Sequence, residues 1–356
     1  LENFTVFSEA EGKLIKIIAK NHQYLGVNKA IPAYLKAREI EDRKIGVFWH
    51  TTGSGKSYSM IFFSNKIFRK TAGNYTFLIV TDRQDLDDQI YKNFEKTGAS
   101  TEPELAIRAQ SGNHLQQLLR EDHRHVFTLI HKFRNERTES GEIIPYPVLS
   151  ERDDIIVIAD EAHRTQYGDL ALNMRVAVPN ASFIAFTATP LLATDEKTRD
   201  IFGDYVSIYN FKQSIDDGAT VPLYYVNRKP EVEIIDQDLN QKILVEIENA
   251  ELDEDEVEKL RKKYPREFNI IVKDDRFDIE AKDIVDHFMG RGYKGKAMVV
   301  SIDRFTAVKM YTKVQFYWKQ RIQELEKKLA TVDEVEKESL RNDIEYMNET
   351  DMAVVI

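Results

Sequence analysis

Short apolar runs alternate with helix-like stretches through the first 210 residues of this 356-residue chain. The runs are rich in β-branched and aromatic residues, and they are IGVFW (45–49), TFLIVT (76–81), VFTLI (126–130), DIIVIAD (154–160) and SFIAFT (182–187). Strands buried on both faces of a parallel sheet have such continuous hydrophobicity, because helices cover both faces. The stretches that we expect to form crossover helices are SYSMIFFSNKIFRK, RQDLDDQIYKNFEK, GNHLQQLLR and GDLALNMRVAV. The alternation predicts an α/β domain with a doubly wound parallel sheet.

The length of the chain favours two domains over one. We expect the first domain at 1–210 and the start of a second domain at 211–356, unfinished at the end of the sequence. The alternating pattern stops near Asn227, and an acid-rich stretch follows. We interpret about 228–290 as a solvated, mostly helical insertion in the second domain.

A strand and a helix are predicted to return after this insertion, as KAMVVS (296–301) followed by DRFTAVKMYTKVQFYW. A long charged stretch at about 315–348 is typical of a helix, but its apolar positions are too sparse for a sustained coiled coil. We expect an inserted helix or a helical hairpin there. The final run, MAVVI, is predicted to be the next strand.

Composition excludes several classes of function. The chain has no cysteine, which excludes disulfides and thiolate metal sites and fits a reducing cytoplasm. No apolar run approaches the roughly 18 residues that span a bilayer, so we expect no membrane partner. The net charge of −10 argues against a uniformly basic nucleic-acid-binding protein but allows a local basic track. His123 and His125 have no further ligands nearby in sequence, and we expect them to be surface histidines.

The strongest motif is HTTGSGKS, which lies between a predicted strand and a predicted helix. Its glycines let the backbone curl and aim N–H groups at phosphates, and the helix dipole favours an anion there. Lys56 would reach the β and γ phosphates, and the hydroxyl of Ser57 would hold Mg²⁺. A chance Gly-Ser turn is the alternative. The expected cofactor-binding residues of the loop are Thr52, Gly53, Ser54, Gly55, Lys56 and Ser57.

Two carboxylates, Asp160 and Glu161, stand at the end of the predicted strand at 154–160, in the sequence DEAHR. One of them, Asp160, would complete the Mg²⁺ shell, and Glu161 would orient or deprotonate an attacking water. His163 has a functional role if DEAH acts as a unit, and is otherwise a surface histidine. Thr187 and Thr189 end another predicted strand, where a simple Thr-Pro turn is the alternative to a coupling element.

Taken together, TTGSGKS, DEAH and TATP resemble the motifs of superfamily 2 helicases and translocases, which clamp ATP between two RecA-like domains. Longer segments are similar to the motor (restriction) subunit of type I restriction-modification enzymes. These are GVFWHTTGSGKS, LIVTDRQDLDDQI, RAQSGNHLQQLL, DEAHRTQYG, FTATPLL, FGDYVSIYNFKQSIDDGATVPLYY and MVVSIDRFTAVKMY. The resemblance runs from about His22 to Ile356. In that family a histidine typically precedes TTGSGKS, so His50 is a family trait.

The resemblance implies an RecA-like fold and assigns roles to residues. Lys56, Asp160 and Glu161 would be catalytic, with Ser57 and Asp160 on Mg²⁺. His163, Thr187 and Thr189 would relay the nucleotide state to DNA and to the second domain. Gln23 resembles the glutamine that reads the adenine edge, although a surface helix glutamine is an open alternative. Arg83 would meet a DNA phosphate unless it only opens a solvated helix, and Arg304, with Ser301, is a weaker candidate.

The resemblance further implies ATP-driven translocation of double-stranded DNA, with methyltransferase and specificity subunits as partners. The nuclease domain and the arginine finger are expected to lie outside this sequence, so we expect the chain to bind ATP but to hydrolyse it poorly alone. The alternatives are another superfamily 2 motor, such as a type III restriction subunit or a stand-alone DNA helicase, and a non-catalytic scaffold. Intact Lys56, Ser57, Asp160 and Glu161 argue against the scaffold.

Overall fold

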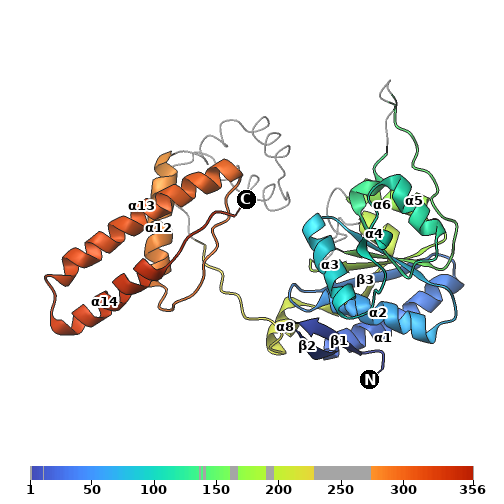
Figure 1. Ribbon diagram of the computed structural model, residues 1–356, viewed down its shortest axis with the longest axis horizontal. Coiled ribbons are helices and arrows are strands. Elements are labelled where there is room, and N and C mark those ends of the chain that lie inside the picture. Colours follow the sequence, from blue (N-terminus) through green and yellow to red (C-terminus); the bar gives the residue numbers. More distant parts are fainter. Residues whose placement is uncertain are drawn as a thin grey trace. The chain divides into compact units, whose positions relative to one another are not determined.

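The computed structural model describes residues 2–10, 12–135, 138, 142–160, 167–189, 196–227 and 274–355. The chain divides into two compact units, Leu1–Tyr224 and Tyr225–Ile356 (Figure 1). The expected domain division at residue 210 falls inside the first unit. No helix among the described residues is long and apolar enough to cross a membrane.

The first unit is built on a six-stranded sheet in the spatial order β5-β4-β6-β7-β3-β8. All of its strand pairs are parallel. The strands are β3 (Lys44–His50), β4 (Thr76–Thr81), β5 (His125–Leu129), β6 (Ile155–Asp160), β7 (Ser182–Thr187) and β8 (Tyr205–Tyr209). The predicted α/β fold class is therefore confirmed, and the predicted runs correspond to β3 to β7. The edge strand β8 was missed, since it pairs only with β3 and is buried over only part of its length.

Helices cover both faces of this sheet, as Figure 1 shows. The longer ones are α1 (Asn21–Glu39), α2 (Lys56–Lys70), α3 (Gln84–Lys96), α5 (Gly112–Arg120) and α6 (Tyr167–Ala177). The shorter ones are α4 (Glu104–Ile107), the 3₁₀ helix η1 (Ile130–Phe133), α7 (Glu196–Phe202) and α8 (Phe211–Asp216). The predicted crossover helices correspond to α2, α3, α5 and α6. Alternate residues of each central strand enter opposite hydrophobic clusters: Phe77 and Ile79 pack toward α1, α2 and α3, whereas Leu78 and Val80 pack toward α5 and α6.

A separate antiparallel hairpin precedes α1. Its strands are β1 (Thr5–Ala10) and β2 (Lys13–Ile18), which pair only with each other. Phe4, just before β1, packs against Tyr24 of α1 and Phe62 of α2, with ring centroids 4.7 and 6.1 Å away. This contact attaches the hairpin to the helical layer on that face of the sheet.

His125 is not a surface residue, and the expectation that it would be one is wrong. It is the first residue of β5 and is 1% exposed, with its ring beside Phe77 and Phe94 at centroid distances of 5.6 and 5.0 Å. Burial lowers the pKa of His125 to about 3, so the imidazole is neutral. The side chain of His123 is 12% exposed. Its Nδ1 lies 2.5 Å from a carboxylate oxygen of Glu102, and its Nε2 lies 2.9 Å from one of Glu121.

The described part of the second unit is helical, with α12 (Asp274–Gly290), α13 (Arg304–Leu329) and α14 (Glu334–Glu349). Helices α13 and α14 form a hairpin in the charged stretch that was predicted to be a helix or hairpin. Trp318 lies in its core and donates a hydrogen bond from Nε1 to the carbonyl oxygen of Met347 at 3.0 Å. The acid-rich stretch at 228–273 lies outside the described residues.

The predictions of a strand at 296–301 and of another in the terminal MAVVI run are wrong. Neither 296–301 nor 352–355 belongs to a strand, and many of these apolar side chains are exposed, including those of Met298 and Val300. A strand exists only where its backbone N–H and C=O groups bond to a neighbouring strand. The described residues of this unit supply no such neighbour.

Candidate active site

The candidate residues lie at the carboxyl ends of the parallel strands, along one edge of the sheet in the first unit. The loop at 51–55 follows β3, Asp160 ends β6, and Thr187 ends β7. Since β6, β7 and β3 are adjacent, the register places Asp160 beside Phe186 and Thr187 beside Trp49. The fold therefore brings together three segments that are far apart in sequence, at the edge where parallel α/β sheets bind ligands.

The loop between β3 and α2 has the backbone of a phosphate cradle. Gly53 and Gly55 have φ angles of +79° and +84°, a left-handed conformation that disfavours any side chain. Gly55 is also the residue at which α2 is capped, so Lys56 and Ser57 form the first turn of that helix. The free N–H groups of a first turn and the helix dipole both favour an anion.

Asp160 is 6% exposed at the end of β6, so its carboxylate lies within the fold and not on an open surface. Thr187 is buried, and its Oγ1 accepts a hydrogen bond from the backbone N–H of Thr189 at 3.2 Å. Trp49, the residue before His50, donates from Nε1 to the carbonyl oxygen of Ala188 at 3.0 Å. The strand that carries the loop is thus bonded directly to the Thr-Ala-Thr segment. Glu161 and His163 lie outside the described residues.

Two consecutive residues at the start of α1 support the loop. Gln23, 4% exposed, donates from Nε2 to the carbonyl oxygen of Gly55 and accepts at Oε1 from the N–H of Lys20, both at 2.8 Å. His22 makes the equivalent contact one residue earlier in the loop, from Nε2 to the carbonyl oxygen of Ser54 at 2.8 Å. The role of Gln23 in reading adenine stays a prediction, since its amide is bonded to backbone here. His22 was missed, because nothing local distinguishes it from the neighbouring polar residues.

His50 is the last residue of β3, directly before the loop; its side chain is buried and its Nε2 is 2.9 Å from Oγ of Ser207 in β8. Burial lowers the pKa of His50 to about 3, with smaller contributions from the neighbouring His22 and Lys56 side chains. The imidazole is therefore neutral at physiological pH. His50 bonds the loop-bearing strand to β8, which is a structural reason for a histidine before the loop.

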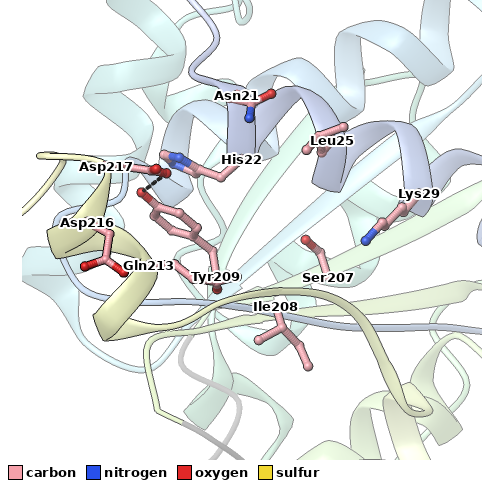
Figure 2. Close-up of a pocket in the computed structure, with 10 residues that line it drawn as sticks. All are labelled: Asn21, His22, Leu25, Lys29, Ser207, Ile208, Tyr209, Gln213, Asp216 and Asp217. Carbon is pink, nitrogen blue, oxygen red and sulfur yellow. Dashed lines mark hydrogen bonds between the residues drawn. The ribbon is translucent and has the colours of Figure 1, made fainter.

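A hollow of about 360 Å³ adjoins these residues (Figure 2). Within it the ring of His22 stacks on that of Tyr209 at a centroid distance of 3.9 Å and an angle of 11°. The hydroxyl of Tyr209 donates to Oδ2 of Asp217 at 2.9 Å. The hollow is lined by Asn21, His22, Leu25, Lys29, Ser207, Ile208, Tyr209, Gln213, Asp216 and Asp217.

The two arginines proposed for DNA lie in different units. Arg83 follows β4 and caps α3, at the same edge of the sheet as the loop. Its guanidinium is paired with Asp85 at 2.5 and 3.1 Å, and this contact lowers the pKa of the Asp85 carboxyl. Arg304 is the first residue of α13 in the second unit, and Ser301 lies just before that helix.

A glycine cradle after a buried parallel strand, with an aspartate and a Thr-Ala-Thr segment at the ends of the adjacent strands, defines a phosphate-loop ATPase of the RecA-like α/β class. The comparison with known families agrees. The chain belongs to the SWI2/SNF2 ATPase family, whose model matches residues 22–258.

Two curated relatives, both type I restriction enzyme endonuclease subunits, are similar to most of this chain. The chain is 38% identical over 330 residues to the type I restriction enzyme HindI endonuclease subunit of Haemophilus influenzae, covering 87% of this chain and 30% of that protein. It is 36% identical over 319 residues to the protein assigned as the type I restriction enzyme MjaIXP endonuclease subunit of Methanocaldococcus jannaschii, covering 87% of this chain and 29% of that protein. The chain thus spans under a third of the length of these relatives.

Among solved structures, the chain is similar to the ATP-dependent type ISP restriction-modification enzyme LlaBIII bound to DNA. The TM-score is 0.41 and the identity 16%, over 58% of this chain and 16% of that chain. A likeness of this extent adds nothing to the family assignment.

Proposed function

We propose that this chain is the ATP-driven motor part of a type I restriction enzyme endonuclease subunit, which moves double-stranded DNA before a nuclease domain cleaves it. The observation that carries the proposal is the phosphate cradle formed by Gly53 and Gly55, aligned with Asp160 and Thr187 on adjacent strands. The identity to type I restriction subunits supports the choice of enzyme. The methyltransferase and specificity subunits are the proposed protein partners, in the cytoplasm.

The residues at the cradle fit ATP and Mg²⁺. Gly53 and Gly55 have the left-handed backbone conformation that aims the loop amides at phosphates, and a side chain at either position would disfavour that conformation. Lys56 is proposed to bind the β and γ phosphates, together with the amides of Thr52 to Ser57. Ser57 and Asp160 supply hydroxyl and carboxylate oxygens, the donors that Mg²⁺ prefers. Bound Mg²⁺ would neutralise the charge that develops on the phosphates.

Glu161, which directly follows Asp160, is proposed to orient the attacking water and accept its proton. Gln23 is proposed to bind the cofactor by reading the adenine edge, and its bond to the carbonyl oxygen of Gly55 places it beside the loop. The Thr-Ala-Thr segment is proposed to couple the nucleotide state to DNA, with His163 of the DEAH sequence. The bond from Trp49 to Ala188 supports this coupling, because a shift of the loop-bearing strand would displace the segment directly.

DNA contacts are proposed for Arg83 in the first unit and Arg304 in the second. Arg83 is suited to a phosphate because its guanidinium is half-exposed and pairs with Asp85, an exposed carboxylate that a phosphate could replace. Of the region 211–356, the part from residue 225 onward, which forms the second unit, is proposed to begin a second RecA-like domain, so that ATP binding and hydrolysis would close and reopen the two domains on DNA.

The proposal is tested with Lys56→Ala in the complete enzyme. Removing the lysine eliminates its charge from the phosphates, so ATP turnover and DNA translocation are expected to fall below detection while the melting temperature is unchanged. Lys92→Ala, on the exposed surface of α3, is the matched control and should turn over ATP normally. Normal turnover by Lys56→Ala would overturn the proposal.

Triplex displacement separates a type I motor from other superfamily 2 enzymes. A double-strand translocase displaces a third strand from a duplex and does not separate the duplex. We expect triplex displacement without unwinding of a labelled duplex. Efficient unwinding would favour a stand-alone helicase instead.

A further inference from the structure

The phosphate loop closes a ring of contacts with His22 and Tyr209. The N–H of Thr51, the first loop residue, donates to the carbonyl oxygen of Tyr209 at 3.0 Å, and the N–H of Ser54 donates to that of Thr51 at 3.2 Å. The carbonyl oxygen of Ser54 then contacts His22 at 2.8 Å. The stack of His22 on Tyr209 completes the ring. The loop is therefore held at both of its ends by one tyrosine of β8, once through backbone and once through His22.

The acceptor in the His22 contact determines which ring nitrogen of His22 carries the hydrogen. A carbonyl oxygen can only accept, so Nε2 of His22 carries the hydrogen and donates to Ser54. Burial lowers the pKa of His22, and the neutral imidazole therefore has its hydrogen on Nε2 and a lone pair on Nδ1. Ser54 is 2% exposed, so its carbonyl oxygen is shielded from water in this loop conformation. Without His22 the loop would keep this conformation only at the cost of an unpaired buried acceptor.

The position of the His22 ring is itself fixed from outside α1. Tyr209 stacks on one face of the ring, and the tyrosine hydroxyl is anchored to Asp217, which follows α8 (Figure 2). Thr220, three residues further, lies close to the loop, since a Cβ at Gly53 would be 3.4 Å from its Cγ2. The segment after β8 thus supports both the histidine and the loop.

We propose that His22 is a positioning residue for the phosphate loop: held by Tyr209, it fixes the Ser54 carbonyl and keeps the loop open for phosphates before nucleotide arrives. This inference rests on the proposed function, because it takes the loop to be the nucleotide site. A preformed loop lowers the ordering cost of binding. His22 touches neither phosphate nor water in this role, so it affects nucleotide affinity more than the chemical step.

The test compares two substitutions that separate the two contacts of His22. His22→Phe keeps an aromatic ring for Tyr209 and loses the donor, whereas His22→Gln loses the ring and keeps an amide donor of similar reach. Binding of the fluorescent nucleotide mant-ADP, with Mg²⁺, is measured by equilibrium titration of the complete protein. We expect the Kd of His22→Phe to rise about tenfold, the effect of one buried hydrogen bond, and His22→Gln to recover part of that loss. His287→Phe, an exposed histidine of α12, is the matched control and should bind as the wild type does.

Steady-state ATP turnover supplies the second readout. A positioning role predicts a KM for ATP raised about tenfold in His22→Phe with kcat within about twofold of the wild type. If His22→Phe does not fold, Tyr209→Leu tests the same support by removing the stacking partner, and its Kd should also rise.

The possible failures are distinguishable. Wild-type affinity for mant-ADP in His22→Phe, or in Tyr209→Leu where that variant replaces it, would overturn this inference and leave the proposed function intact. A wild-type protein that binds no mant-ADP would overturn the proposed function itself, and the inference with it.

Discussion

The indole Nε1 of Trp49 donates a hydrogen bond to the carbonyl oxygen of Ala188 at 3.0 Å. Trp49 lies two residues before the phosphate loop, and Ala188 lies between Thr187 and Thr189. Strands β3 and β7 are neighbours, with Trp49 opposite Thr187 in the register. The bond therefore joins the strand that ends in the loop to the segment proposed for coupling.

Trp49→Phe removes the donor of this bond and keeps an aromatic ring. The loss of about 1 kcal/mol should lower the melting temperature of the first unit by roughly 2–4 °C. If the bond contributes to coupling, the ratio of DNA-stimulated to basal ATP turnover should fall as well, which turnover assays with and without duplex DNA measure. Trp318→Phe is the matched control, since it loses a bond to Met347 in the second unit and should leave that ratio unchanged. If Trp49→Phe leaves the ratio of DNA-stimulated to basal turnover unchanged, the bond has a structural role and does not contribute to coupling.

Gly55→Ala should abolish mant-ADP binding. The φ of Gly55 is +84°, and a Cβ there would be 2.8 Å from Nε2 of Gln23, so the loop and its glutamine support would both move. Gly98→Ala is a matched control, because Gly98 has a φ of +64° with no atom within 4 Å of an added Cβ. The control should lose about 1 kcal/mol of stability through backbone strain and bind nucleotide normally. Tight mant-ADP binding by Gly55→Ala would contradict the assignment of the cradle.

Arg108→Met should strongly destabilise the first unit. The Arg108 guanidinium pairs with Asp87, Asp88 and Glu104, and the side chains of Arg108 and Asp87 are only 12% and 4% exposed. Burial raises the pKa of Asp87 against the opposing effect of Arg108, so removing the arginine leaves a buried carboxylate without its cation. We expect a loss of about 3 kcal/mol and a melting temperature roughly 6–12 °C lower, measured by calorimetry.

The double variant Asp87→Asn/Arg108→Met should recover most of that loss, because it removes both charges. Arg321→Met breaks a more exposed pair with Glu324 and serves as the control, with an expected change of about 0–1 kcal/mol. If Arg108→Met costs no more than this control, the buried cluster does not stabilise the fold.

His123 should make the stability of the first unit depend on pH. Burial alone would lower the pKa of His123, but its hydrogen bonds to Glu121 and Glu102 outweigh burial and raise the pKa above its usual value. The folded state thus favours the protonated ring. The stabilisation is complete below the unfolded-state pKa of about 6.5 and disappears as pH rises through the raised folded-state pKa.

His123→Gln keeps a donor and removes the charge, so it isolates this effect. The difference in melting temperature between the wild type and the variant should be largest at about pH 6, below the unfolded-state pKa, and should decline as pH rises through the raised folded-state pKa. Differential scanning calorimetry at several pH values measures it. A difference that does not change with pH would show that the charge of His123 contributes nothing.

The core strands could be predicted because their pattern is local. The runs predicted at 76–81 and 182–187 have the same bounds as β4 and β7, and every residue in both strands is buried. Helices on both faces make each strand apolar without interruption, and the polar residues at its ends mark its limits. The loop and Asp160 could be predicted equally well, because the loop directly follows such a strand and Asp160 is the last residue of one.

The errors fall where structure depends on a neighbour. The run at 296–301 has the composition of a strand but no described strand beside it, whereas YVSIY (205–209), a short run interrupted by a serine, forms β8 because it pairs with β3. His125 is buried because β5 directs it toward Phe94 of α3, which its charged neighbours in sequence do not indicate. Pairing and packing, and not composition, decided each case.

The sequence by itself determined the chemical groups of the site: the glycines, Lys56 and Ser57 of the loop, and the carboxylate of Asp160 at the end of a strand. Each belongs to a short segment whose conformation follows from its own residues. Only the tertiary structure decided what holds the loop in place. The His22–Ser54 and Trp49–Ala188 bonds join residues 32 and 139 positions apart. Such contacts depend on sheet order and register, which are set by the packing of the whole unit and leave no local pattern in the sequence.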